Sequence, residues 1–496
     1  MTQIHAHIDR HAAERPDGPA LRDSDGIAFD WARYKAATES AATLLTDHGV
    51  GAGDRVMAVA ENCAALAALV FGTSRIGARL VPVNARMTAP EIDRVTAHCR
   101  PRVTIFTTGA SPAAVAHAGE APRLRTPYGE IALTRDPDAP AEPGDDTAVV
   151  LYTTGTTGDP KGVMLTHGNL DFAGHASAEL RGMAPDERLY GALPLTHVFG
   201  LASMLTAGAV AGAEVQLEAR FAPDKLLAAL QDGVSVLPAV PQMHAVLMAH
   251  TAAQGIERLT GGKLRYVSSG AAPLDPAWKR KAEAFYGLPL QNGYGMTEST
   301  AGICATRNEI GDPDTSVGPP LPGCEIRIVS PDSEGIGEIE TRGPHVMKGY
   351  YHAPDLTAEV LDPDGWLKTG DLGRIDEAGR LHIAGRKKEL IIRSGFNVHP
   401  PEVEAALNDH PDVVQCAVIG RPRNGNEDVL AFVQPARPGV DPTVLADFAR
   451  ERLSAYKRPS AIFVVDALPA ASTGKILKHR LLTAFADRIA AHDAGG

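Results

Sequence analysis

The chain has 496 residues, of which 44% are hydrophobic and 22% charged, and its net charge is −12. This length predicts two to four domains of about 150 residues, and the composition is typical of a folded globular protein. Acidic chains are poor candidates for general nucleic-acid binding, although a few well-placed cations can still bind an anionic ligand. The sequence contains no apolar run of about 18 residues, so we expect no integral membrane contact. The N-terminus lacks an apolar signal core. Five scattered cysteines argue against a disulfide framework or a cysteine zinc site, so we expect a cytoplasmic protein.

The first part of the chain alternates short β-branched runs with amphipathic stretches. The predicted elements are a strand at Arg55–Ala60, a helix at Cys63–Ile76, a strand at Leu80–Val83, a helix at Pro90–His98 and a strand at Val103–Phe106. This alternation predicts parallel sheets covered by helices. The acidic, proline-rich segment Asp136–Asp146 is expected to be a surface linker, and Ala148–Tyr152 a buried strand.

Further along, Gly337–Thr341 and Leu381–Gly385 flank turn-rich sequence and predict a small antiparallel region. A compact α+β unit follows. Its predicted elements are strands at Glu389–Ile392, Val413–Ile419, Val429–Val433 and Ile462–Val465 and helices at Pro401–Asn408 and Val444–Leu453. The predicted fold class is therefore α/β. A large N-terminal domain, residues 1–387, has parallel-rich sheets covered by helices plus the antiparallel region, and a small α+β C-terminal domain covers residues 388–496.

A segment rich in threonine and glycine, Thr153–Gly162 (TTGTTGDPKG), directly follows the buried strand. Its glycines let the backbone approach a ligand closely, and consecutive amide groups in such a loop can cradle an anion. Threonine hydroxyls and the Lys161 ammonium add further donors. The alternative interpretation is a polar hairpin turn. The spacing does not fit a Walker A loop, which disfavours an ordinary P-loop ATPase or kinase.

Six more motifs follow in order. They are Pro194–Gly200 (PLTHVFG), Ser269–Pro273 (SGAAP), Asn292–Glu298 (NGYGMTE), Thr369–Gly373 (TGDLG), Gly385–Glu389 (GRKKE) with Ser394–Asn397 (SGFN), and Ser472–Lys478 (STGKILK). Together with the segment Thr153–Gly162, which we call the phosphate loop, these motifs resemble the adenylate-forming superfamily. Within it they resemble the AMP-forming acyl-CoA synthetases of the fatty acid and 4-coumarate–CoA ligase type. The resemblance covers about Pro16 to Leu482. No Gly-x-Ser-x-Gly elbow supports a serine hydrolase.

The resemblance implies that the chain binds ATP, Mg²⁺ and coenzyme A and activates a small carboxylic acid. The implied ATP- and AMP-binding residues are Thr153, Thr154, Gly155, Thr156, Thr157, Gly158, Lys161, Gly270, Ala271, Ala272, Pro273, Asn292, Gly293, Tyr294, Gly295, Met296, Thr297, Asp371, Arg386 and Lys475. The implied catalytic residues are Lys475, Thr297, Glu298 and His197, with Glu298 as the magnesium ligand. Tyr294 would stack on adenine, Asp371 would accept the ribose hydroxyls, and Lys475 would stabilise the charge that builds on the α-phosphate.

The implied reaction has two halves, acyl-AMP formation with release of pyrophosphate and then transfer of the acyl group to CoA with release of AMP. Between them the small domain would rotate about Lys388, bringing the CoA-tunnel residues Ser394, Gly395 and Phe396 to the cleft. The implied acyl pocket comprises His197, Phe199, Met204, Val240, Met243, His244, Gly270, Gly293, Gly295, Thr300 and Ala301. Because Gly295 replaces the tryptophan of acetate-type relatives, and Val246 the arginine of malonate-type ones, an apolar monocarboxylate is expected, either a medium- or long-chain fatty acid or an aryl or phenylpropenoic acid.

Several alternatives stay open. The acyl group could pass to a carrier-protein pantetheine, the chain could be a non-catalytic nucleotide-binding homologue, or it could be a luciferase-type oxygenase, which shares every motif. A homodimer is also left open. His5, His7 and His11 fall near one face of a predicted N-terminal helix, but no carboxylate motif accompanies them, so we expect no metal site there.

Overall fold

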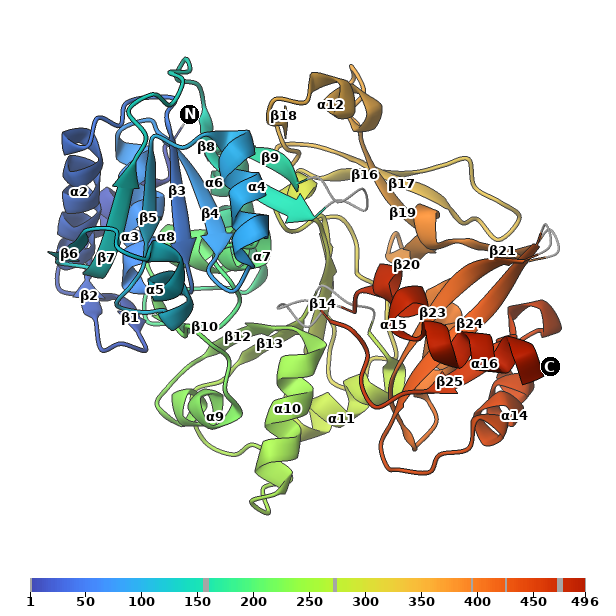
Figure 1. The fold of residues 1–496 in the computed structure, drawn as a ribbon. Helices are drawn as coiled ribbons and strands as arrows, with labels where there is room; N and C mark the ends of the chain where they lie inside the picture. The colour runs from blue at the N-terminus through green and yellow to red at the C-terminus, as the bar shows by residue number, and fades with distance from the viewer. Residues whose placement is uncertain are drawn as a thin grey trace.

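Two eight-stranded mixed sheets form most of the first 350 residues (Figure 1). The computed structural model describes residues 2–154, 160–270, 274–393, 396–423, 426–470 and 476–495. Sheet I runs through β15 (Cys304–Ala305), β14 (Leu290–Tyr294), β13 (Tyr266–Ser269), β12 (Val236–Ala239), β10 (Arg188–Gly191), β11 (Glu214–Leu217), β1 (Pro19–Asp23) and β2 (Ala28–Asp30). Sheet II runs through β18 (Gly349–Tyr350), β9 (Pro160–Thr166), β8 (Thr147–Thr154), β4 (Arg79–Asn84), β3 (Arg55–Ala60), β5 (Val103–Phe106), β7 (Gly129–Arg135) and β6 (Arg123–Thr126).

Helices cover the two sheets. Those before residue 361 are α1 (His5–Glu14), α2 (Trp31–Asp47), α3 (Ala64–Arg75), α4 (Ala89–Cys99), α5 (Pro112–Ala118), α6 (His167–Leu180), α7 (Val198–Gly200), α8 (Ala207–Ala211), α9 (Pro223–Gln231), α10 (Pro241–Ala252), α11 (Pro276–Tyr286) and α12 (Pro354–Val360). Alternate residues of β3 serve opposite faces of sheet II. Val56 and Ala58 join the large core that includes both sheets and α2 and α3, whereas Met57 and Val59 pack with residues of α4 and α5. Both faces of this strand are therefore buried, as its continuous apolar sequence requires.

A four-stranded antiparallel sheet follows, in the spatial order β16 (Glu325–Val329), β17 (Gly337–Arg342), β19 (Leu367–Ile375) and β20 (Leu381–Arg386). Its small core includes Ile303, Ile339 and Leu381, and Tyr294 of sheet I packs against it. The antiparallel region is thus joined to the end of β14 by apolar contacts.

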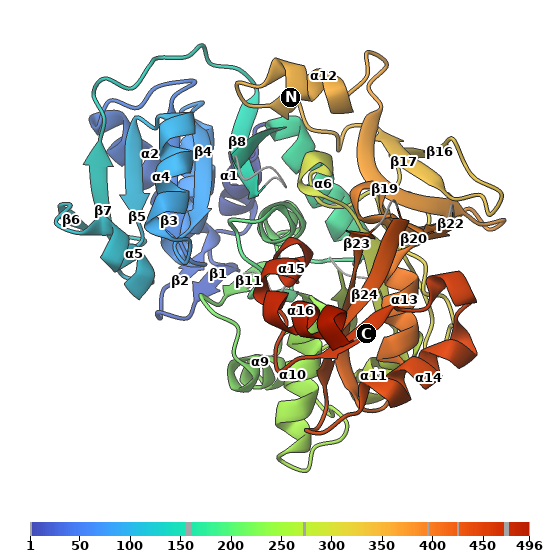
Figure 2. The ribbon, with the colours of Figure 1, turned by 45° about the vertical axis from the view of Figure 1, so that its right-hand side comes forward.

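The C-terminal part has two cores around a short hairpin and a three-stranded sheet. Its elements are β21 (Ile391–Arg393), β22 (Phe396–Val398), α13 (Pro400–Asn408), β23 (Val413–Arg423), β24 (Asn426–Pro435), α14 (Pro442–Arg452), β25 (Ala461–Val464), α15 (Leu481–Ala484) and α16 (Ala486–Gly495). Both views place this part beside α11 (Figures 1 and 2). Burial and then the neighbouring Asp275, the N-cap of α11, raise the pKa of Asp409 at the end of α13, which places the two carboxyl groups together.

The predicted α/β fold class is confirmed, including the antiparallel region and the small α+β unit. Strands β3 and β5 have the predicted bounds. The sheets are parallel-rich as predicted, with antiparallel pairs towards their edges, where β2, β7, β9, β15 and β18 pair antiparallel with their neighbours. One expectation is corrected. The strand expected at Glu389–Ile392 begins later, because residues 387–389 form a 3₁₀ turn. The domain boundary at residues 387/388 stays a prediction.

All five cysteines are buried and unpaired. Within the described ranges, none of the helices combines the length and the apolar character needed to cross a bilayer.

Candidate active site

Four neighbouring parallel strands of sheet I end at one edge of that sheet. The partners Ala239–Ser269 and Ser269–Asn292 keep the ends of β12, β13 and β14 level, and β10 lies beside β12. In open α/β sheets, ligands bind beyond the carboxyl ends of such strands. Val240 and Gly270 directly follow β12 and β13, and Gly293 and Tyr294 end β14. The fold therefore brings two of the predicted motifs and the predicted pocket residue Val240 to one edge.

The base of the phosphate loop is an antiparallel hairpin, in which Thr153 of β8 pairs with Lys161 of β9. The hairpin is therefore present at the base of this segment, and phosphate binding stays a prediction, since a hairpin can also present a glycine-rich connection to a ligand. The residues between the strands, including the predicted ligands Gly155, Thr156, Thr157 and Gly158, lie outside the described residues, as does the side chain of Thr154.

A tyrosine that sequence reasoning missed links this hairpin to the predicted magnesium ligand. The Lys161 Nζ atom lies 5.3 Å from the centre of the Tyr350 ring, a cation–π contact. The Tyr350 hydroxyl donates a hydrogen bond of 2.9 Å to Glu298 Oε1. The Glu298 carbonyl accepts a second bond from Met347 N at 2.9 Å. Residues 347–350 therefore fix Glu298 beside Lys161. In the sequence, only the adjacent tyrosines Tyr350 and Tyr351 could have drawn attention to Tyr350.

On the predicted ribose side, Tyr294, Asp371 and Arg386 meet. The Tyr294 hydroxyl donates to Asp371 Oδ2 at 2.6 Å, and Arg386 Nε lies 3.4 Å from Asp371 Oδ1. The backbone N–H of Asp371 donates to Thr369 Oγ1. Burial, and then the Asp371 charge, raises the pKa of Tyr294 well above its usual range, so its hydroxyl stays protonated and donating. The predicted acceptor for the ribose hydroxyls is therefore held in place from two sides.

The turn after β14 is strained. Thr300 and Ala301 have φ angles of 48° and 85°, in the left-handed region that residues with a Cβ rarely adopt. A Cβ on Gly295 would lie 1.3 Å from the Ala301 carbonyl oxygen, so only glycine fits there. Within this turn Thr297 is buried, and Met296 N–H donates to Ser299 Oγ. Such strain is typical of functional sites, which agrees with the predicted role of this motif.

The predicted motif Pro194–Gly200 lies against the end of β13. A Cβ on Gly270 would lie 3.0 Å from the Phe199 ring, so the ring covers this glycine directly. His197 is exposed, and its Nδ1 accepts a hydrogen bond of 3.2 Å from Phe199 N. The π-helix Leu201–Thr206 follows at once and buries Met204 completely. Short π-helical segments occur frequently at functional sites.

The remaining predicted pocket residues are mostly buried. Val240 is partly buried, and Met243 and Thr300 are buried, the latter donating to the His345 carbonyl at 2.8 Å. His244 is fully buried; its Nδ1 pairs with the Tyr286 hydroxyl at 2.8 Å and its Nε2 with the Ser268 carbonyl at 3.2 Å. These bonds place the His244 ring behind β13.

Asn292 is buried too, and its side-chain amide donates to the Ser316 carbonyl at 3.1 Å. This bond anchors β14 directly before Gly293.

The first part of the chain, residues 8–351, matches the family described as AMP-binding enzyme, and residues 402–475 match the AMP-binding enzyme C-terminal domain. The chain belongs to the AMP-binding enzyme family. It is an AMP-forming acyl-CoA synthetase, an ATP-dependent carboxylate–CoA ligase.

Two relatives in this family are similar over nearly their whole length. A feruloyl-CoA synthase from Amycolatopsis sp is 35% identical over 96% of this chain and 98% of the relative. An indoleacetate–CoA ligase from Aromatoleum aromaticum is 32% identical over 95% of this chain and 96% of the relative. The shared length means that the whole catalytic unit is compared.

Solved structures of the AMP-binding enzyme family superpose over almost the whole chain. ATP-bound MatB from Rhodopseudomonas palustris is 30% identical, covers 98% of this chain and 99% of its own, and gives a TM-score of 0.84. The apo form of the same protein, with the same coverage, gives 0.75. The o-succinylbenzoate CoA synthetase from Bacillus subtilis in complex with ATP and magnesium is 29% identical and gives 0.83, covering 96% and 98% of the two chains. The arrangement of this AMP-binding enzyme thus resembles the ATP-bound form of MatB more than its apo form.

The C-terminal residues that the family resemblance singled out are only partly described. Lys388 is exposed in the 3₁₀ turn, and Phe396 stacks on Tyr456 with ring centres 4.7 Å apart. In the lysine motif, Lys478 Nζ lies 2.8 Å from Glu404 Oε1 and 3.1 Å from Glu389 Oε2. The predicted residues Ala271, Ala272, Pro273, Ser394, Gly395 and Lys475 lie outside the described residues.

Three buried histidines of this AMP-binding enzyme give a testable pH dependence. Burial lowers the pKa of His167, His244 and His345 from 6.5 to about 4. As the pH falls from 6.5 towards 4, the unfolded chain binds a proton at each site that the folded chain does not. We therefore expect the free energy of unfolding to fall by up to about 1.4 kcal/mol per pH unit for each histidine. Urea unfolding of wild type and His244→Gln at pH 7.5 and 5.5 tests this, because the variant should lose less stability in acid; equal losses would contradict it.

Proposed function

We propose that this ligase activates an apolar monocarboxylate, with an aryl or phenylpropenoic acid preferred to a medium- or long-chain fatty acid, and transfers the acyl group to CoA. The observation that carries the substrate class is the chemistry of the predicted acyl pocket. All of its residues are described, and none is a lysine or arginine. His244 stays neutral near pH 7, because burial lowers its pKa to about 4. A second carboxylate would therefore be buried there without a counter-charge, which costs free energy.

The aromatic preference has two supports. The Phe199 ring lies against Gly270 at the end of β13, where it can pack edge-to-face or offset-stacked on an aromatic substrate. The relatives named above act on ferulate and indoleacetate, as their names state. Both are monocarboxylic aryl acids of moderate size, which fits a pocket of glycines, methionines and a valine.

In the proposed first half-reaction, a substrate carboxylate oxygen attacks the α-phosphorus of ATP. A new O–P bond forms, the bond from the α-phosphorus to the bridging oxygen breaks, and pyrophosphate leaves with the electron pair. Tyr294 and Asp371 would fix the adenosine, Lys161 the phosphates, and Lys475 would stabilise the charge developing on the α-phosphate. In the second half-reaction the CoA thiolate attacks the acyl carbon, and AMP leaves.

Glu298 fits the role of magnesium ligand. Mg²⁺ prefers one or two carboxylates together with phosphate oxygens and waters, and Tyr350 holds this carboxylate near Lys161 at the base of the phosphate loop. When bound, the ion would neutralise charge on the ATP phosphates. Tyr350 would act on the reaction only by orienting Glu298, which makes it a positioning residue.

The arrangement of the C-terminal part supports the adenylate-forming state. The higher TM-score with ATP-bound MatB than with apo MatB is one support. The exposure of Ile392 and Phe396, 55% and 54%, is another, because Phe396 is the one described residue of the proposed CoA tunnel and its side chain is open to solvent. We propose that rotation about Lys388 brings this loop to the cleft for thioester formation.

A panel of acids tests the substrate class. Pyrophosphate release is measured with straight-chain fatty acids from acetate (C2) to C16, and with benzoates, cinnamates and malonate. We expect the highest kcat/KM with a cinnamate or benzoate, an intermediate value with fatty acids, and the lowest values with acetate and malonate. A clear preference for malonate or acetate would contradict the pocket argument.

The acceptor is tested with the best acid of that panel. AMP release should depend on CoA, whereas release only with a pantetheine-bearing carrier protein would favour the carrier-loading alternative. No pyrophosphate release with any acid would support the non-catalytic homologue, and light emission with oxygen would support the luciferase type. A cytoplasmic location and a homodimer remain predictions.

A further inference from the structure

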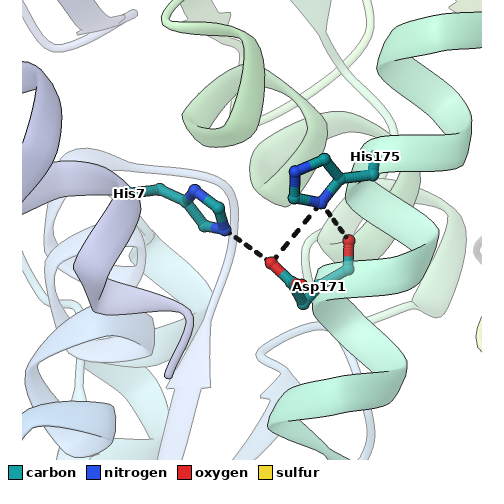
Figure 3. Close-up of side chains that lie close together, drawn as sticks. All are labelled: His7, Asp171 and His175. Atoms are coloured by element: carbon teal, nitrogen blue, oxygen red, sulfur yellow. Dashed lines mark hydrogen bonds and ion pairs between the residues drawn. The ribbon is translucent and has the colours of Figure 1, made fainter. Parts of the chain in front are cut away.

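We propose that His7, Asp171 and His175 form a Zn²⁺ site that joins the N-terminal helix α1 to helix α6 (Figure 3). His7 Nε2 lies 2.6 Å from Asp171 Oδ1, and His175 Nδ1 lies 3.5 Å from the same oxygen. The three candidate ligand atoms all lie within 4.8 Å of one another. Figure 3 shows the His7 ring directed at the Asp171 carboxylate, and the His175 ring facing both that carboxylate and the Asp171 backbone carbonyl.

These separations suit a small tetrahedral ion. With Zn–N and Zn–O bonds of about 2.0–2.1 Å, the edge of a zinc tetrahedron is about 3.4 Å. The observed distances between ligand atoms lie on both sides of this value, so side-chain rotations would complete the site. Two imidazole nitrogens and one carboxylate favour zinc over magnesium or calcium, which prefer oxygen ligands throughout.

The local structure supplies three fixed directions for the ligands. Asp171 and His175 stand four residues apart on α6, so their side chains share one helix face. His7 is 5% exposed and enters from α1, whereas the His175 side chain is 54% exposed. The exposed side gives a metal ion an entry path and leaves room for a water as fourth ligand. The site is thus of the open type, with three protein ligands.

The charges around the site are mixed. Metal binding requires an ionised Asp171 carboxylate and neutral imidazoles at His7 and His175. Arg10 opposes a cation by repulsion, and His175 Nδ1 must give up its 2.9 Å contact with the Asp171 carbonyl.

This site corrects the sequence expectation that the N-terminal histidines lack a carboxylate partner. Asp171 lies 164 residues from His7 and reaches it only through the packing of α1 on α6. His5 and His11 take no part: His5 Nδ1 lies 2.9 Å from Ser74 Oγ, and His11 packs on Trp31. No local pattern in the sequence contains all three ligands.

Zinc would act on stability rather than on the reaction. On the same helix, Asn169 donates two hydrogen bonds of 2.8 Å to the carbonyls of Pro344 and Val346, in the segment that leads to Tyr350. A metal bridge would therefore tie α1 to a helix that supports the candidate active site. A ligand that binds the folded state but not the unfolded state raises the melting temperature once its concentration exceeds Kd.

The test uses the untagged, metal-stripped full chain without nucleotide, with excess Mg²⁺ to occupy oxygen-rich sites. Zinc chloride is titrated by calorimetry, and Tm is measured with and without it. We expect wild type to bind one equivalent of zinc more than His175→Ala or Asp171→Asn and to gain several degrees in Tm, a gain that both variants lose. His250→Ala is the matched control, since this helical histidine pairs only with Gln254 among the described contacts.

His175 is exposed, so its replacement should leave the fold intact, and all variants should keep the wild-type rate of pyrophosphate release without zinc. Equal zinc stoichiometry and equal Tm gain in wild type and His175→Ala would overturn the proposal, as would loss of the same equivalent in His250→Ala. A visible Co²⁺ spectrum of tetrahedral type in wild type, absent from His175→Ala, would give independent support; an octahedral spectrum would reject the proposed geometry.

Discussion

Replacing Lys475 by alanine is expected to lower acid-dependent ATP–pyrophosphate exchange by about 10²–10³-fold, the usual cost of removing one preorganised donor to developing charge. The ammonium group would stabilise the transition state as the carboxylate attacks the α-phosphorus. Under the proposed rotation about Lys388, Lys475 would leave the cleft before the thioester half-reaction, so the variant should still convert supplied acyl-adenylate and CoA to acyl-CoA at close to the wild-type rate. Exchange and thioester formation are measured separately.

Lys478→Met provides the contrast within the same motif. Lys478 is paired with Glu404 and Glu389, and its loss would leave Glu404, which is largely buried, without its partner. We expect this variant to lower Tm and both half-reactions together. Near-normal exchange in Lys475→Ala, or an equal loss of both half-reactions with an unchanged Tm, would contradict the role proposed for Lys475.

Replacing Glu298 by glutamine should also cause a large loss, about 10²-fold or more in kcat/KM for pyrophosphate release. The amide keeps an oxygen that can accept the Tyr350 hydrogen bond but removes the negative charge that a magnesium ligand needs. Tyr350→Phe makes the reverse change, because the carboxylate stays and its orienting bond is lost. A hydrogen bond to a charged group contributes about 1.5–3 kcal/mol, so this loss should be about ten- to hundredfold.

The magnesium dependence separates the two effects. In Tyr350→Phe the apparent affinity for Mg²⁺ should fall while saturating Mg²⁺ restores part of kcat; in Glu298→Gln no concentration should restore it. If Glu298→Gln reached the wild-type rate at any magnesium concentration, the metal ligand would have to be another residue.

Local patterns predicted the central strands of sheet II and several helices, whereas no strand was predicted for the centre of sheet I. The apolar run of β3 and the period of α13 each carry enough information within a few residues. The directions of the edge strands were not predictable in this way. Whether a strand pairs parallel or antiparallel depends on which other strand lies beside it in the fold. β9 returns antiparallel to β8 only because five residues connect them.

The candidate site shows the same division. Asp371 and Tyr294 could be found from motifs, but their hydrogen bond joins residues 77 positions apart. Tyr350 carries no motif of its own, and its contact with Glu298 arises from β18 pairing with β9. His7 and Asp171 meet only through helix packing. Residues whose role depends on one distant partner were therefore the ones that sequence reasoning missed.

The turn at Gly295 bears on how substrate range can change in this family. The family resemblance implies that acetate-type relatives narrow their pocket with a tryptophan at this position, yet here even a methyl group would overlap the Ala301 carbonyl. A Gly295→Trp substitution alone is therefore expected to disrupt this turn, because the added Cβ would meet backbone atoms. The backbone at Thr300 and Ala301 would have to change first, so adaptation of this chain to smaller acids is expected to start elsewhere in the pocket.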